Sequence, residues 1–414
     1  MSYLQFTTEF IGLPDFKIGS PYKAGDGSWI CPLKPRQKDF PCPLCGQTSK
    51  NHSRDKKRKL RHRFVPGWGT VYVTVPVFRQ RCDVCGLTWT VEWPGIPPGR
   101  AQATKPYMDA AVKACYRADI QSIAREWAIP YTTLERWYYK KASASLPDPK
   151  KFNSPKVVCM DEFAIKRGHK YCVALMDHAS GHVWQVFEGR SREKIQAGLR
   201  DWPFDEAPEV VVTDLAPGMA ETIHEIWPDT VVVADKFHVM CLFFHKLNAQ
   251  RKLLKDKPTK HKAVRFLKKL LTTDPKNLTI EQKEELAKLL ETNWKLSDLY
   301  NGLQELRSIY NCSDAGEGKR LFKEWLLKRM YDGCGAVKSV AKTLSQWSNE
   351  VTAYFTYRVT NAPMEGTNNL IKTLKRRAYG FRNINRFTQR IRLECREPKQ
   401  EKTDSLPETL KIAA

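Results

Sequence analysis

The sequence lacks the features of a membrane-spanning or secreted protein. Its apolar runs fall well short of the roughly 20 residues that a membrane-spanning helix needs. The longest candidate, VMCLFFHKL, carries His245 and Lys246, and we interpret it as a helix of a folded core. The opening segment, MSYLQFTTEF, has neither the basic nor the apolar region of a secretory signal. We therefore expect a soluble, cytoplasmic protein.

Negative charge is also scarce. The 414 residues include 45 Asp and Glu against 69 Lys and Arg, which leaves a net charge of +24. An excess of positive charge on this scale indicates a polyanionic partner, and nucleic acid is a stronger candidate than an anionic membrane surface. A chain of this length is expected to divide into two or three domains.

Disulfide bonds are not expected, because a cytosolic compartment does not sustain them, so the 12 cysteines should be thiols or metal ligands. Four of them stand in two Cys-x-x-Cys-Gly segments, Cys42 with Cys45 and Cys82 with Cys85. A tight turn in each segment aims both sulfur atoms at one ion, and two such segments complete a tetrahedral site. We predict a structural Zn²⁺ site in a zinc-ribbon-like finger. Further candidate ligands are Cys31, His52 and His62.

A strongly basic segment separates the two cysteine pairs. Residues 53–64, SRDKKRKLRHRF, contain seven Lys or Arg in twelve residues. We expect a loop that contacts DNA phosphates without reading base sequence, and the alternative is a solvated charged loop. The candidate contacts are Arg54, Lys56, Lys57, Arg58, Lys59, Arg61 and Arg63.

Residues 105–142 have apolar positions at helical spacing and a break at AIPY. This pattern predicts two short helices arranged as a helix-turn-helix, in which the second helix enters the major groove. That helix should cover about Tyr131 to Lys140. Thr132, Thr133 and Arg136 are its candidate contacts to bases or phosphates.

Strand patterns follow a linker rich in Ser, Pro and Lys. Apolar, β-branched runs predict strands at residues 157–163, 171–177 and 182–187, followed by EVVVTD, a helix-length segment and TVVVAD. Three strands followed by alternation of strand and helix indicate an α/β layer structure with a mixed sheet.

Aspartates accompany three of these strands. Asp161 lies within the first, Asp214 closes the fourth and Asp235 closes the fifth. Successive side chains of a strand point to opposite faces, so only one of Asp161 and Glu162 can reach a given site. The pattern alone does not choose between them.

A single acidic residue heads a basic helix near the end of the chain. Helical spacing places Glu365, Asn368, Asn369, Lys372 and Arg376 along one polar face. Taken alone, Glu365 is an acidic residue that the helix dipole favours in a first turn.

Three segments resemble the bacterial insertion-sequence transposases of the ISL-three family: DEFAIKRGHKY, VVVADKFHV and EGTNNLIKTLKRRAYGFRN. The likeness extends over nearly the whole chain. It implies an N-terminal zinc finger, a helix-turn-helix and an RNase H-like catalytic domain of the DDE type. In that domain Asp161, Asp214 and Glu365 would hold Mg²⁺ or Mn²⁺. The resemblance favours Asp161 over its neighbour Glu162.

Metal-assisted phosphodiester cleavage suits such a site, because two Mg²⁺ ions about 3.5 to 4 Å apart neutralise charge on the attacked phosphate and the leaving oxygen. The last helices would hold the DNA through Asn368, Asn369, Lys372, Lys375, Arg376, Arg377 and Arg382. Asp235 and His238 are auxiliary candidates, with a strand-end cap and a packed histidine as the alternatives.

The function that the resemblance implies is a DNA transposase. Such an enzyme binds the terminal inverted repeats of its insertion sequence, cuts the strands and transfers them to target DNA, and pairing two ends requires a homodimer or a larger assembly. It would work in the bacterial cytoplasm, associated with the nucleoid when bound to DNA. One alternative is a non-catalytic, sequence-specific DNA-binding regulator, and another is a nuclease that cuts without joining.

The expected fold class is therefore multidomain α/β. The expected domains are a zinc-binding domain at 1–98, a helix-turn-helix at 99–145, the first part of the catalytic domain at 146–240, an all-α insertion at 241–354, the last catalytic helices at 355–398 and a flexible tail at 399–414. We expect Trp294, Trp325 and Trp347 to fill a small core of the insertion.

Overall fold

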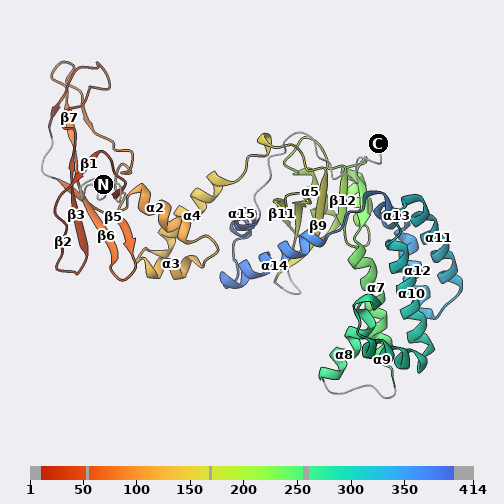
Figure 1. Cartoon of the computed structure of the whole chain (residues 1–414). Coiled ribbons are helices and arrows are strands. Elements are labelled where there is room, and N and C mark those ends of the chain that lie inside the picture. The colour runs from red at the N-terminus through yellow and green to blue at the C-terminus, as the bar shows by residue number, and fades with distance from the viewer. Residues whose placement is uncertain (1–10, 53–55, 167–169, 255–260, 396–414) are drawn as a thin grey trace. The chain divides into compact units, whose positions relative to one another are not determined.

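The computed structural model describes residues 11–52, 56–166, 170–254 and 261–395 (Figure 1). The chain forms two compact units, residues 1–145 and residues 146–414. Both contain helices and strands, so the architecture is mixed α/β. No helix within the described ranges is both long and apolar enough to cross a membrane.

The first unit begins with two small β-sheets. The larger has the order β1-β3-β6-β5 with β2 added to β3, and the smaller has the order β4-β7-β8. In the larger sheet β3 and β6 are parallel, whereas β5 and β6 are antiparallel. The strands are β1 (Phe16–Ile18), β2 (Tyr22–Lys23), β3 (Trp29–Pro35), β4 (Lys50–Asn51), β5 (Lys57–Val65), β6 (Gly69–Pro76), β7 (Arg79–Arg81) and β8 (Thr88–Thr90).

The basic segment is a strand, so the prediction of a loop was wrong for its larger part. In β5 the side chains alternate, because Leu60 and His62 are buried while Lys57 and Lys59 are exposed. This period of two lets one face of the strand join the apolar core and leaves the cations in solvent. Arg54 lies outside the described residues.

Three helices complete the first unit, where the sequence pattern predicted two. They are α2 (Lys105–Ala114), α3 (Ile120–Glu126) and α4 (Tyr131–Ser145). The carboxylate of Asp119 caps α3 by accepting from the backbone N–H groups of Gln121 and Ser122. Ala128, with φ at 50°, makes the tight turn that leads into α4. The helix α4 continues past the predicted end at Lys140.

The second unit is built on a five-stranded mixed sheet with the order β11-β10-β9-β12-β13. The strand β10 is antiparallel to both β11 and β9, and β12 and β13 run parallel to β9. All five strands expected from the sequence are present. They are β9 (Val157–Lys166), β10 (Lys170–Asp177), β11 (Val183–Glu188), β12 (Val210–Thr213) and β13 (Val231–Ala234).

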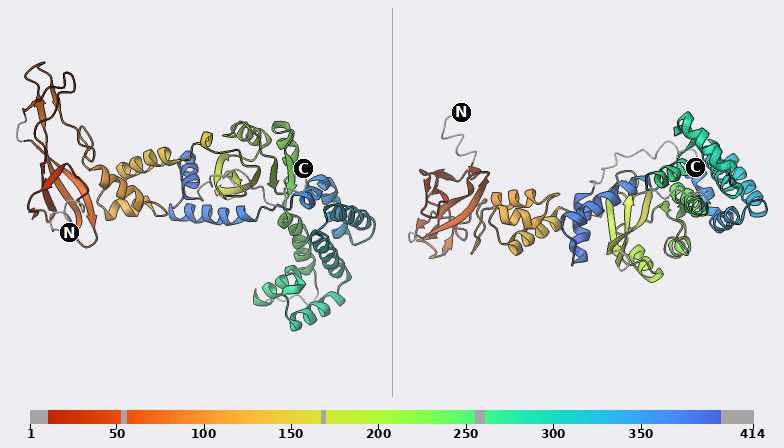
Figure 2. Two further views of the ribbon diagram at one scale, coloured as in Figure 1. Left: turned by 45° about the horizontal axis from the view of Figure 1, so that its top comes forward. Right: turned by 90° about the horizontal axis from the view of Figure 1, so that it is seen from below.

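Helices cover both faces of this sheet, as Figures 1 and 2 show. Val158 and Met160 of β9 belong to the core shared with α5 (Arg192–Arg200) and α6 (Met219–Ile226). Cys159 and Phe163 belong instead to the core under α14 (Ala362–Arg377) and α15 (Ile384–Glu394). Because side chains alternate along a strand, Asp161 projects toward the face covered by α14.

A helical module stands in the chain between β13 and α14. Its helices are α7 (Lys236–Arg251), α8 (His261–Thr272), α9 (Ile280–Glu291), α10 (Trp294–Tyr310), α11 (Ala315–Tyr331), α12 (Gly335–Gln346) and α13 (Ser348–Tyr357). The segment VMCLFFHKL lies in α7, as predicted. The module shares one continuous apolar core with the sheet. Trp325 and Trp347 are buried in that core, but Trp294 is 66% exposed, so its predicted core position was wrong.

Candidate active site and metal centre

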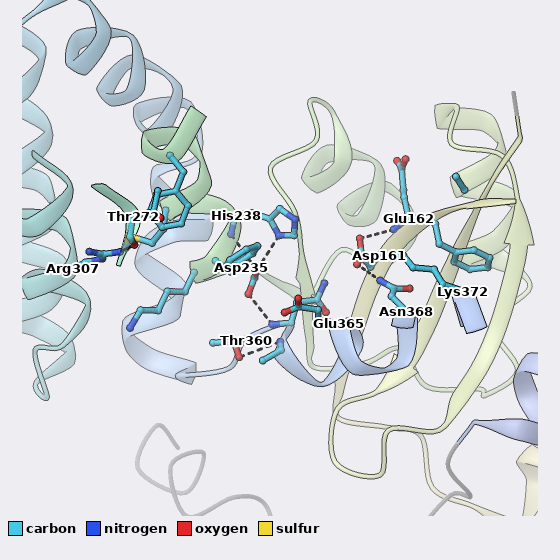
Figure 3. A pocket seen from close by; sticks show the side chains of 18 residues that line it. Asp161, Glu162, Asp235, His238, Thr272, Arg307, Thr360, Glu365, Asn368 and Lys372 are labelled. Atoms are coloured by element: carbon cyan, nitrogen blue, oxygen red, sulfur yellow. Dashed lines mark hydrogen bonds and ion pairs between the residues drawn. The ribbon is translucent and has the colours of Figure 1, made fainter. Parts of the chain in front are cut away.

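A cavity of about 770 Å³ opens where β9, α7 and α14 meet. Asp161 and Glu365, which are far apart in the sequence, both line it (Figure 3). His238 and Lys372 line it as well. The cavity therefore collects acidic and basic groups from segments that are far apart in the chain.

The acidic groups lie at the carboxyl ends of neighbouring parallel strands. Asp214 directly follows β12 and Asp235 directly follows β13. The pairing of β9 with β12 ends at Cys159, so Asp161 lies just beyond the part of β9 that β12 covers. Carboxyl ends of adjacent parallel strands are a common place for binding sites in α/β folds, because the loops that follow them leave a crevice.

Two donors hold the carboxylate of Asp161. The backbone N–H of Glu162 donates to Oδ1 at 2.7 Å, and the side-chain amide of Asn368 on α14 donates to Oδ2 at 2.6 Å. Burial raises the pKa of Asp161, the nearby charge of Asp214 raises it further, and the two donors lower it. The side chain is thus fixed in direction and still has lone pairs free on both oxygens.

Glu162 also lines the cavity, although it alternates with Asp161 along β9. Burial raises the pKa of Glu162, and so does the charge of Asp214, whereas Arg190 lowers it. Asn368 contacts Asp161 and has no hydrogen bond to Glu162 among the described residues. Both carboxylates are therefore at the site, but only Asp161 is held by α14.

Asp214 is close enough to Asp161, Glu162 and His238 to shift their pKa values. It is not among the residues that line the cavity. Within the described ranges, only four cysteines form a ligand set whose donor atoms all lie within 4.8 Å of one another. Asp161, Asp214 and Glu365 are therefore neighbours that do not converge on a single point.

Asp235 is buried, with 2% of its surface exposed, and it connects three elements. Its carboxylate caps α7 by accepting from the backbone N–H of His238 at 3.3 Å, and it contacts the His238 ring nitrogen Nδ1 at 3.0 Å. Its other oxygen accepts from the backbone N–H of Asn361 at 2.9 Å. The hydrogen bond with Asp235 raises the pKa of His238. Asp235 is thus the strand-end cap that the sequence left as an alternative, and it also lines the cavity.

Asn361 fixes the start of α14 against the sheet. Its side-chain amide donates to the carbonyl of Met160 at 3.3 Å, next to Asp161 on β9. The helix therefore begins between β9 and α7, and Glu365 in its first turn is exposed at the cavity.

The other polar residues of the last helices have different surroundings. Asn368 is buried against Asp161, and the Lys375 ammonium group donates to the carbonyl of Ala164 at 2.8 Å. Both of these candidate DNA contacts therefore bind β9, and Asn368 does not lie free on the polar face that the sequence predicted. The exposed members of the predicted set are Asn369, Lys372, Arg376, Arg377 and Arg382.

The four predicted cysteine ligands come together in the first unit. Their Sγ atoms all lie within 4.8 Å of one another, with Cys42 to Cys85 and Cys45 to Cys82 at 3.5 Å. Each knuckle closes in the same way, because the glycine after the pair has φ at 73° and donates to the carbonyl of the first cysteine. This arrangement suits a tetrahedral thiolate site for Zn²⁺.

The substitute ligands are not part of that cluster. The ring of His62 is buried between the hydroxyl of Thr104 at 3.0 Å and the carbonyl of Ile11 at 2.8 Å. Cys31 is buried in the apolar core, and burial raises the pKa of its thiol. His52 is exposed and lies outside the cluster.

The candidate DNA contacts of the first unit are only partly free. Lys56 and Lys57 are exposed, whereas Arg58 donates to the carbonyls of Pro97 and Ala101. Lys59 forms an ion pair with Asp26 at 3.5 Å, and Arg61 and Arg63 are half-buried. On α4, Thr132 and Arg136 are exposed and Thr133 is half-buried.

Sequence reasoning missed the roles of Asn361 and Asn368. An asparagine before Ala-Pro is a signal for a helix start, and the helix does start there. No local signal indicates that the Asn361 amide turns away from the helix to Met160, because the two residues are 201 positions apart.

Replacing Cys82 by Ser should release the zinc from the purified protein, because three thiolates hold the ion far less well than four. The measurement is zinc content per chain by elemental analysis. Cys312→Ser is the matched control, since Cys312 lies in the second unit and its Sγ contacts a backbone carbonyl. Equal zinc in the two variants would contradict the four-thiolate site.

Asp235→Ala should destabilise the second unit by about 2 to 4 kcal/mol, because it removes a helix cap and leaves the Asn361 N–H without its acceptor. The measurement is the free energy of unfolding in urea. Asp314→Ala is the control, since Asp314 caps α11 from an exposed position and should cost about 1 kcal/mol. Similar losses for both variants would show that the contact with α14 adds nothing.

Comparison with known proteins relates the chain to transposases. The family model of the ISL3 DDE transposases, described as Transposase, matches residues 158–391. The transposase for insertion sequence element IS1001 of Bordetella parapertussis is 25% identical over 374 residues, which cover 87% of this chain and 90% of that protein. The transposase for insertion sequence element IS1557 of Mycobacterium tuberculosis is 23% identical over 392 residues, which cover 87% of each chain.

The matched region begins in β9 and ends in α15, so it contains every element that contributes a residue to the cavity. The chain belongs to the ISL3, or ISL-three, family of insertion-sequence transposases.

Proposed function

We propose that this transposase binds the terminal inverted repeats of its insertion sequence and performs metal-dependent strand cleavage and strand transfer with Asp161, Asp214 and Glu365. The observation that supports this most directly is that Asp161 from β9 and Glu365 from α14 line one cavity, with Asp214 on the neighbouring strand end. The strand order, three antiparallel strands followed by two parallel ones, supports an RNase H-like assignment for the sheet.

The donor set suits Mg²⁺ or Mn²⁺. All three proposed ligands are carboxylates, and hard divalent cations prefer oxygen. None of the three has an ion pair with Lys or Arg in the described part of the chain, so they gather negative charge that a cation would balance. In a two-metal site the ions are about 3.5 to 4 Å apart, so three carboxylates do not need to meet at one point.

Bound divalent ions would polarise the scissile phosphate and stabilise the leaving oxygen. The protein's part is to hold the ligands in place. The Glu162 N–H and the Asn368 amide orient Asp161, and the anchored start of α14 positions Glu365. Lys372 is exposed at the same cavity and can contact a phosphate. Water would attack in line first, and the freed 3′-hydroxyl would then attack target DNA, without a covalent enzyme intermediate.

The first unit would supply recognition of the terminal repeats. The helices α3 and α4 suit a helix-turn-helix, with Thr132 and Arg136 exposed on the second helix. The exposed lysines at the start of β5 would add phosphate contacts, and Zn²⁺ would hold the two knuckles together. Pairing two element ends would require at least two copies of the chain.

Glu365→Gln should bind DNA that carries the element ends but cut it roughly 100-fold more slowly or not at all, because a metal ligand is lost. Glu221→Gln is the matched control, since Glu221 is an exposed residue in the first turn of α6 and lies outside the cavity. The assay compares cleavage and transfer into a plasmid with and without Mg²⁺. Full activity of Glu365→Gln would remove Glu365 from the site.

The same assay separates the alternative functions. Cleavage without strand transfer would identify a nuclease. Tight binding of the element ends by the wild type, with no metal-dependent cutting at any salt concentration, would identify a regulator.

Exchanging Lys56 and Lys57 together for Gln should reduce the slope of log K against log salt by about two, because each phosphate contact releases about 0.9 counterion. Lys323 and Lys338 form the control pair, since they are exposed on the helical module. The measurement is DNA affinity over a series of salt concentrations. An unchanged slope in the first variant would mean that these two lysines do not contact DNA.

A further inference from the structure

The cavity extends well beyond the carboxylates. Figure 3 shows Arg307 and Thr272 at the opposite end from Asp161 and Lys372, with Glu365 and His238 between the two ends. The end formed by α7, α8 and α10 takes no part in holding metal in the function proposed above. It nevertheless belongs to the same continuous cavity of about 770 Å³, which is within the range of about 300 to 1,000 Å³ that encloses small organic ligands.

Two cations at this end form no ion pair with a carboxylate among the described residues, although the nearby charge of Asp274 raises the pKa of both. The Lys236 ammonium group lies over the rings of Tyr310 and Tyr354, at 5.5 and 5.8 Å from their centres. Arg307 donates to the backbone carbonyls of Thr272 and Thr273 at 2.6 and 3.2 Å. Half-buried charges are normally paired, so this end of the cavity is suited to an anion.

The positive charges around Lys236 agree with that geometry. Burial lowers the pKa of Lys236, and the positive charges of Arg358 and Arg307 lower it further. Burial also lowers the pKa of Arg307, whereas the charge of Asp274 raises it. A bound phosphate would offset the repulsion at Lys236, because it would place a negative charge beside these like charges.

An exposed aromatic ring, that of Phe237, comes directly after Lys236 in the first turn of α7. Phe237 lines the cavity, yet 55% of its surface is exposed. It follows Asp235 and Lys236, so the capped first turn of α7 fixes its backbone, and its ring makes an edge contact with His238. A flat apolar surface open to a cavity next to cations is the combination that stacks on a nucleobase.

We propose that this end of the cavity takes one nucleotide unstacked from the DNA beside the scissile phosphate. Phe237 stacks on its base, and Lys236 and Arg307 contact its phosphate. The inference rests on the proposed function, because it names a part of the substrate for that same site. The base must leave the duplex, since a stacked base presents only its edges, whereas an unstacked one presents its face.

The first test is binding, which does not depend on cutting. The probe is duplex DNA with the element's terminal repeat, in which 2-aminopurine replaces each base near the cleavage site in turn, with Ca²⁺ in place of Mg²⁺. Wild type should raise the fluorescence at one position, because that base loses its stacked neighbours. Phe237→Ala should abolish the rise, and Phe237→Trp should keep it. Tyr331→Ala is the control, since Tyr331 is 77% exposed and lies outside the cavity.

The second test is cleavage in Mg²⁺. Phe237→Ala should cut intact DNA about tenfold more slowly than wild type, because stacking on the unpaired base is lost. An abasic nucleotide at the position found by fluorescence should restore most of the rate, since there is no base left to unstack. Tyr331→Ala should cut at the wild-type rate on both DNAs.

The inference is overturned if no 2-aminopurine position responds in the wild type, or if Phe237→Ala gives the same response as the wild type. The proposed function fails separately, through activity that survives Glu365→Gln or through a wild type that never cuts. If one base responds in the fluorescence test but the wild type never cuts, the inference stands and the catalytic proposal fails.

Discussion

The site depends on the hydrogen bonds that the carboxylate of Asp235 accepts. It is buried at the end of β13, and it accepts from the first turn of α7 and from the residue that starts α14. A buried carboxylate is costly unless its oxygens are satisfied, so these donors must be present in the folded chain. The requirement brings together the sheet, the helical module and the helix that carries Glu365. The hydrogen bond from Asn361 to the carbonyl of Met160 then holds the start of that helix next to Asp161.

The two ends of the cavity differ in charge for a related reason, with carboxylates beside Lys372 at one end and the cations Lys236 and Arg307 toward the other. Acidic groups gather where parallel strands end, and cations come from α7 and α10 of the module, which shares its core with the sheet. A polyanion bound across the cavity would meet cations on one side and carboxylates on the other. Divalent ions would remove the repulsion between carboxylates and a phosphate, because each ion can bind oxygens of both. The module is therefore part of the site and not an appendage to it.

The sequence was sufficient for features that depend on local pattern. The five strands of the second unit, the aspartates near their ends and the two cysteine knuckles follow from periodicity and spacing. It was insufficient where tertiary contacts decide. Residues 57–65 read as a basic loop because the cations outnumber Leu60 and the buried His62, and the role of Asn368 depends on a partner 207 positions away. Trp294 was misplaced because composition does not tell which side of a helix faces the core.

The separation between Asp161 and Asn368 has a consequence for the newly made protein. Ribosomes synthesise all five strands of the sheet before α14, so a nascent or truncated chain contains the strands without the helix that closes the cavity. Contacts of such long range form late, because the intervening chain must be ordered first. An unfinished chain thus presents an aspartate without its amide partner and without Glu365. The order of synthesis keeps the cavity incomplete until α14, close to the end of the polypeptide, has been made.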